Sequence, residues 1–115
     1  MRAVSNKSPL NHYRWGEGCD GWNLVDEPSL SVKQERMPAG CSEKTHLHQY
    51  AQQFFFILSG IAVFEMEGRR IEVASNQGIH VPPGTPHRIS NESREDLQFL
   101  LCSQPSSAKD RINCP

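Results

Sequence analysis

The sequence lacks any long apolar run and any concentration of positive charge. Its 115 residues carry 12 basic and 13 acidic side chains, and the basic ones do not gather in one stretch. Nucleic acid is therefore not expected as a partner, because phosphate binding needs a concentrated positive surface. No stretch approaches the roughly 20 apolar residues that span a bilayer, so a membrane is not expected either.

Cysteine is sparse and shows no pattern. The chain has four: Cys19, Cys41, Cys102 and Cys114. They form no C-x-x-C pair of the zinc-ribbon type and are too few for a disulfide scaffold. The polar stretch over residues 1–18 also lacks the apolar block of a secretory signal. We therefore expect free thiols and a cytoplasmic location.

A helical repeat of apolar residues is absent as well. From Trp22 onward, short alternating or apolar stretches are separated by turn residues such as Glu67-Gly68. Eight or more short strands in one domain are typical of an all-β sandwich or barrel. The ends are rich in Ser, Pro and Asn. We therefore expect an N-terminal arm over residues 1–21, a β-barrel over 22–104 and a C-terminal tail over 105–115.

Two histidines stand two positions apart in the stretch HLHQYAQQFFFILSG, residues 46–60. Side chains alternate along a strand, so His46 and His48 project from the same face, about 7 Å apart. They can share a metal ion with His87, which follows the rigid stretch PPGTP, and Gln53 is the candidate fourth ligand. The alternative is that these histidines are ordinary hydrogen-bonded or surface residues.

The spacing around these histidines resembles the first motif of the cupin family. That motif is a glycine, five residues, H-x-H, three or four residues, a glutamate, six residues and a glycine. In this sequence the corresponding residues are Gly40, His46, His48, Gln53 and Gly60. Every spacing fits, and only the glutamate is replaced.

The stretch NQGIHVPPGTPHRISN resembles the second cupin motif. That motif is a glycine, five residues, P-x-G, two residues, a histidine, three residues and an asparagine. Pro82, Gly84, His87 and Asn91 match it, whereas Asn76 stands at the opening glycine. Asparagine tolerates left-handed backbone better than most side chains, so the turn can survive this change. Together the motifs span residues 40–91.

The resemblance implies a double-stranded β-helix, or jelly-roll β-barrel, with a metal ion inside one end. By position, His46, His48 and His87 are the implied ligands, and Gln53 takes the place of the usual carboxylate. Cupin chains of this size also resemble one another in pairing as homodimers. The aromatic stretch over residues 12–22 would suit such an interface.

Glutamine in place of glutamate removes one negative charge and one strong oxygen ligand from the site. Three neutral histidines then leave the double positive charge of a divalent ion to be balanced by water or a small organic anion. Imidazole ligands suit Fe, Ni, Zn, Cu or Co. Gln53 either binds the ion or orients a histidine or the ligand. A third alternative is a site that has lost its metal.

Two functions from different classes fit this sequence. One is a metal-dependent enzyme, dioxygenase-like or isomerase-like, that acts on a small anionic organic molecule in the barrel. The other is a non-catalytic barrel that binds or senses such a molecule. The sequence shows no additional base, such as a well-placed Lys or Glu, for isomerisation. Arg36, Arg88 and Arg111 could hold an anion, although arginine is more often a solvated surface residue.

Overall fold

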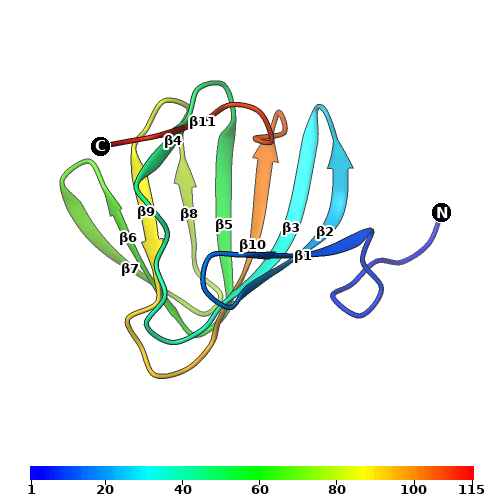
Figure 1. Cartoon of the computed structure of the whole chain (residues 1–115), viewed down its shortest axis with the longest axis horizontal. Coiled ribbons are helices and arrows are strands. Elements are labelled where there is room, and N and C mark those ends of the chain that lie inside the picture. Colours follow the sequence, from blue (N-terminus) through cyan, green and yellow to red (C-terminus); the bar gives the residue numbers. More distant parts are fainter.

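The computed structural model describes all 115 residues. Eleven strands form two antiparallel sheets (Figure 1). The six-stranded sheet has the order β1-β2-β3-β10-β5-β8, and the five-stranded sheet has the order β11-β4-β9-β6-β7. The strands are β1 (Asn11–Trp15), β2 (Cys19–Glu27), β3 (Leu30–Met37), β4 (His46–His48), β5 (Gln52–Ser59), β6 (Ile61–Met66), β7 (Arg69–Ala74), β8 (Gly78–Val81), β9 (His87–Ser90), β10 (Leu97–Gln104) and β11 (Arg111–Asn113). This is the expected all-β jelly-roll fold. No helix of a length and apolarity that could cross a membrane is present.

Two turns have the backbone that the sequence predicts. Glu67 and Gly68, between β6 and β7, have φ angles of 54° and 71°, as in the two-residue hairpin turns that match strand twist. Asn76 has a φ of 65°, so asparagine adopts left-handed backbone at the position of the motif's opening glycine. At Gly78 the reason for glycine is space, because an added Cβ would lie 2.4 Å from Cζ of Phe54.

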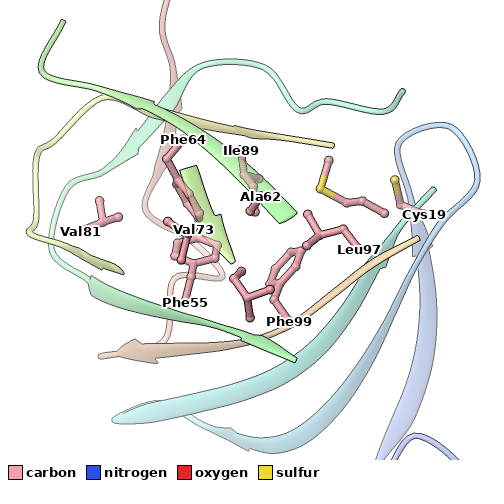
Figure 2. Packing of buried hydrophobic residues seen from close by; sticks show 11 residues of the cluster. Cys19, Phe55, Ala62, Phe64, Val73, Val81, Ile89, Leu97 and Phe99 are labelled. Atoms are coloured by element: carbon pink, nitrogen blue, oxygen red, sulfur yellow. The ribbon is translucent and has the colours of Figure 1, made fainter. Parts of the chain in front are cut away.

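The hydrophobic core lies between the two sheets and is dominated by aromatic rings (Figure 2). The ring of Phe55 from β5 packs 5.0 Å from that of Phe64 on β6 and 5.7 Å from that of Phe99 on β10. The other core members are smaller: Cys19, Met37, Ile57, Ala62, Val73, Val81, Ile89 and Leu97. Burying such rings supplies much of the free energy that holds the sheets together.

Strand β5 shows the alternation expected of a half-buried strand. Gln53, Phe55 and Ile57 are at most 3% exposed, whereas Phe54 and Leu58 are 43% and 39% exposed. The apolar run FFFIL therefore divides between the barrel interior and the outer face of the six-stranded sheet. Of the inward residues, Ile57 and Phe55 belong to the core, whereas Phe55 and Gln53 line the same cavity as His46 and His48.

Both ends of the chain contribute strands to the two sheets. Part of residues 1–21 forms β1 and the beginning of β2, which extend the six-stranded sheet. Residues 111–113 form β11, which runs beside β4 (Figure 1). The two strands pair antiparallel, with Arg111 opposite His48. An uncovered edge of β4 would leave backbone N–H and C=O groups unpaired, and β11 satisfies them. The two sheets of the barrel thus include strands from both sides of residues 22–104.

Candidate metal centre

Three histidines meet where β4 and β9 lie side by side. His46 on β4 is the cross-strand partner of His87 on β9, and their ring centroids lie 4.5 Å apart. The ring of His48 lies 5.0 Å from that of His46. All three are buried, and one nitrogen from each lies within 4.8 Å of the others. These three residues could hold a metal ion.

Hydrogen bonds fix which ring nitrogen of each histidine is available. In His46 and His87, Nδ1 lies 2.9 and 2.8 Å from the backbone carbonyl oxygen two residues earlier. In His48, Nδ1 lies 2.8 Å from a carboxylate oxygen of Asp110. Carbonyl and carboxylate oxygens only accept, so each Nδ1 carries the proton and each Nε2 keeps its lone pair. His87 Nε2 is buried without a hydrogen-bond partner.

Burial also keeps these imidazoles neutral. It lowers the pKa of His46 to about 4, although the hydrogen bond to the Lys44 carbonyl opposes the change. Burial lowers the pKa of His48 and of His87 in the same way. Near neutral pH the site therefore offers three unprotonated nitrogens, which is the form that binds a metal ion.

Asp110 anchors His48 from the segment before β11. Its Oδ2 accepts hydrogen bonds from the backbone N–H groups of Tyr50 and Ala51, at 3.0 and 2.9 Å. Burial alone would raise the pKa of Asp110, but hydrogen bonds from Ala51, Tyr50 and His48 hold it below its usual value. A carboxylate that orients a histidine in this way supports metal binding. No pattern in the polar C-terminal stretch points to this role.

Gln53 lies in the same cavity as His46 and His48. Its Nε2 donates to Ser103 Oγ at 3.0 Å, and its buried Oε1 has no hydrogen-bond partner. A buried amide oxygen without a partner costs free energy unless something else satisfies it. Three imidazole lone pairs beside a free amide oxygen fit a divalent ion with nitrogen and oxygen ligands.

The cavity beside the histidines has a volume of about 270 Å³. This is near the lower end for pockets that take small organic molecules. Phe55 and Ile89 belong both to its wall and to the core. Phe55 and Ile57 lie on the same side of β5 as Gln53, but only Phe55 lines the cavity, whereas Ile57 packs in the core.

The expectation that no Lys or Glu stands in a position to act as a base is wrong. Lys33 and Glu35 of β3 line the cavity, together with Glu43. On β3 the polar side of the alternation faces inward: Ser31 is 1% exposed, whereas Leu30 is 40% exposed. The sequence showed the alternation but gave no sign that the polar side was the inner one.

The three arginines considered as anion ligands have different surroundings. Arg111 lines the cavity. Arg36 is paired instead with Asp20 at 2.6 Å, and Arg88 lies 3.3 Å from Glu65. Only Arg111 is therefore placed to meet a ligand beside the histidines.

The charges around the cavity favour an anion. Burial raises the pKa of Glu43 to about 8, and burial raises the pKa of Glu35 as well. Both carboxyl groups are therefore biased toward their uncharged form, and the basic side chains of Lys33 and Arg111 line the same cavity. A divalent ion on the histidines would add to this positive field.

Comparisons with known proteins agree with this architecture. A family model described as a cupin domain matches residues 33–103. An uncharacterized protein from Methanocaldococcus jannaschii is 31% identical over 83 residues, which cover 72% of this chain and 66% of that protein. The oxalate-binding protein of Thermotoga maritima is 29% identical over 97 residues, covering 79% and 80% of the two chains.

A solved structure agrees in fold over almost the whole chain. KdgF from Halomonas sp. superposes with a TM-score of 0.82 at 16% identity, covering 91% of this chain and 95% of that one. The match of the family model spans well over half of the sequence and includes His46, His48, Gln53 and His87. The chain therefore belongs to the cupin family.

Proposed function

We propose that this cupin binds one divalent transition-metal ion and acts on a small organic anion held beside it. One observation carries the proposal: three neutral imidazoles present their Nε2 lone pairs to one place, at a cavity that also contains Lys33 and Arg111. The proposed ligands are His46, His48 and His87. Their chemistry suits Fe, Ni, Zn, Cu or Co.

We give Gln53 the fourth position around the ion. Its unpartnered Oε1 supports this role, because a neutral amide oxygen can complete the ligand set without adding charge. In the alternative role, Gln53 orients the bound anion instead. Either way the ion keeps its double positive charge, which strengthens its attraction for anions and for polarised carbonyl oxygens.

A carboxylate-bearing ligand fits the cavity best. Lys33 and Arg111 supply two cations, and the raised pKa values of Glu35 and Glu43 reduce the competing negative charge. A relative named for binding oxalate supports the same class of ligand. The reaction belongs to the dioxygenase-like or isomerase-like chemistries that an open metal site allows.

The second candidate is a barrel that binds or senses the anion without converting it. The name of the Thermotoga maritima relative, which mentions binding alone, favours this candidate. The two functions share the metal and the ligand, and they differ in whether the cavity contains a working acid–base group.

The metal content of the purified protein tests the shared part. We expect about one transition-metal ion per chain by elemental mass spectrometry, and little in His48→Ala, because two histidines alone hold the ion weakly. His80→Ala is the matched control, since His80 is exposed and bonds Gln52. Wild type should also bind oxalate in calorimetry. Equal metal content in wild type and His48→Ala would contradict the proposed site.

We also propose a homodimer, formed through the outer face of the six-stranded sheet. Phe54 is 43% and Leu30 is 40% exposed there, and the ring of Phe54 lies 6.4 Å from that of Phe56. Exposed apolar side chains on β3 and β5, the two strands that flank β10, suit a second copy of the same face. Light scattering should give twice the chain mass, and a monomer at micromolar concentration would refute the dimer.

A further inference from the structure

The cavity contains a second polar group besides the histidines, made by Tyr13 and Glu35. The Tyr13 hydroxyl donates a hydrogen bond to Oε2 of Glu35 at 2.5 Å. Both residues come from the six-stranded sheet, whereas His46 and His48 come from the five-stranded sheet. All four line one cavity. A small ligand there is enclosed by histidines from one sheet and a hydrogen-bonded carboxyl group from the other.

The contact between Tyr13 and Glu35 depends on a missing side chain on the strand between them. Tyr13, Gly21 and Glu35 occupy one cross-strand row over β1, β2 and β3. A Cβ on Gly21 would lie 2.0 Å from Cζ of Tyr13. Glycine therefore lets the tyrosine ring cross β2 and reach the carboxyl group. Lys33 Nζ lies 5.5 Å from the centre of the same ring.

The surroundings of Glu35 suit proton transfer. Burial raises its pKa, whereas the hydrogen bond from Tyr13 and the charges of Lys33 and Arg111 oppose the rise. Burial and the neighbouring Glu35 raise the pKa of Tyr13, so the phenol stays a hydrogen-bond donor. A carboxyl group in such surroundings, held in the cavity wall by a tyrosine hydroxyl, can both give and accept a proton. The other titratable groups that sense Glu35 are Cys19 and Glu43.

We propose that Glu35 is the acid–base residue of this cavity and that its substrate is a small 2-oxo carboxylate. The inference rests on the proposed function, because the histidine end must first bind the anion. A 2-oxo carboxylate has the negative charge that Lys33 and Arg111 favour. It also has a C–H bond next to a carbonyl group, which is the bond that a positioned carboxylate can ionise.

The proton transfer balances without an oxidant or reductant. The Glu35 carboxylate takes a proton from the carbon next to the carbonyl group, so that C–H bond breaks and an O–H bond forms on Glu35. The electron pair of the broken bond moves into the carbonyl group and gives an enolate. Return of a proton from Glu35 to the enolate carbon restores the ketone and the carboxylate. Tyr13 holds Glu35 in position throughout.

Deuterium exchange tests this role directly. The full-length protein, as purified and with its metal content measured, is incubated with pyruvate in D₂O, and loss of the methyl proton signal is followed by NMR. We expect wild type to catalyse the exchange and Glu35→Gln to slow it by at least about 100-fold. Glu72→Gln, on an exposed glutamate of β7, is the matched control and should exchange as wild type does.

Three further measurements separate the two proposals. Glu35→Gln should keep the metal content of wild type and should still bind oxalate, which also shows that the variant is folded. Tyr13→Phe should move the pH profile of the exchange, because it removes the hydrogen bond to Glu35. If wild type binds metal and oxalate without exchanging pyruvate, the inference is refuted and the binding function stands. If Glu35→Gln exchanges normally, the inference is refuted and another group performs the proton transfer. If wild type binds neither, both proposals fail.

Discussion

At the scale of single residues, the cavity combines groups whose charges are set by burial. Burial lowers the pKa of the histidines and raises the pKa of Glu35 and Glu43. Both changes have the same cause, since leaving water disfavours whichever form is charged. The result is a cavity in which burial favours the uncharged forms of the histidines and glutamates, with the side chains of Lys33 and Arg111 in the same wall.

Glu43 should make the stability of the metal-free protein depend on pH between 6.5 and 8. Its pKa in the folded protein is about 8 and its ordinary value is 4.5, so in this range the unfolded chain releases a proton that the folded chain holds. Stability should therefore fall as the pH rises. The histidines act in the opposite direction near pH 6.5, where the unfolded chain still holds part of their protons, and their effect fades about one pH unit higher.

The melting temperature, measured with a chelator present, checks this expectation. Toward pH 8, where the histidines no longer titrate, it should decline in wild type and decline less in Glu43→Gln, and the raised pKa of Glu35 acts in the same direction as that of Glu43. Glu72→Gln should keep the wild-type slope, since its side chain is exposed. An identical slope in Glu43→Gln would mean that Glu43 ionises normally in the folded protein.

At the scale of whole strands, the short strand β11 connects the end of the chain to the metal centre. It pairs with β4, and the residue before it, Asp110, holds His48 through Nδ1. Asp110 also accepts the N–H groups of Tyr50 and Ala51. One carboxylate thus fixes both a proposed ligand and the loop that leads to β5.

Asp110→Asn should weaken metal binding by about 10- to 100-fold. An amide has only one accepting oxygen, so it cannot serve both His48 and the backbone N–H groups of residues 50 and 51. Competition with a chromogenic chelator would give the affinity, and Asp26→Asn, on an exposed residue of β2, provides the comparison. Unchanged affinity in Asp110→Asn would show that β4 alone positions His48.

The strands also show which parts of the fold a sequence can predict. The alternation on β5, the hairpin at Glu67-Gly68 and the three histidines were predictable, because apolar periodicity, turn residues and motif spacing are local signals. The inward side of β3 was not predictable, because it is polar and faces the cavity instead of the apolar core. Strand β11 was not, because its partner, β4, lies about 60 residues earlier and its own composition resembles a tail.

At the scale of the whole molecule, the barrel divides into an apolar part and a polar part. Phe64 and Phe99 fill the core, and two of the histidines, His46 and His48, line the cavity together with the glutamates, with Phe55 at the boundary. The core supplies the stability that lets the other part keep buried polar groups. The fold is therefore expected to survive the loss of the metal, although with lower stability.

Metal binding should stabilise the folded protein measurably. The three histidines come together only when β4 and β9 pair, so the ion binds the folded state far better than the unfolded chain. At an ion concentration 100 times the dissociation constant, the gain is about 2.7 kcal/mol, or a rise in melting temperature of roughly 10 °C. Scanning calorimetry with and without a chelator measures it.

His87→Ala gives the contrast for this measurement, because it removes one proposed ligand from β9. The variant should melt at the same temperature with and without the ion. A shift of wild-type size in His87→Ala would place the stabilising ion elsewhere on the molecule.

The pairing of distant strands also has a consequence for how the chain folds. β6 and β7 form a local hairpin, but β3 must find β10 and β4 must find β11, each more than 60 residues away. Such non-local closures slow folding to the range of milliseconds to seconds. The hairpin can form early, whereas the histidine centre appears only after the last long-range contacts close. A nascent chain therefore does not bring the three histidines together until it is almost native, so it cannot bind an ion early in a wrong geometry.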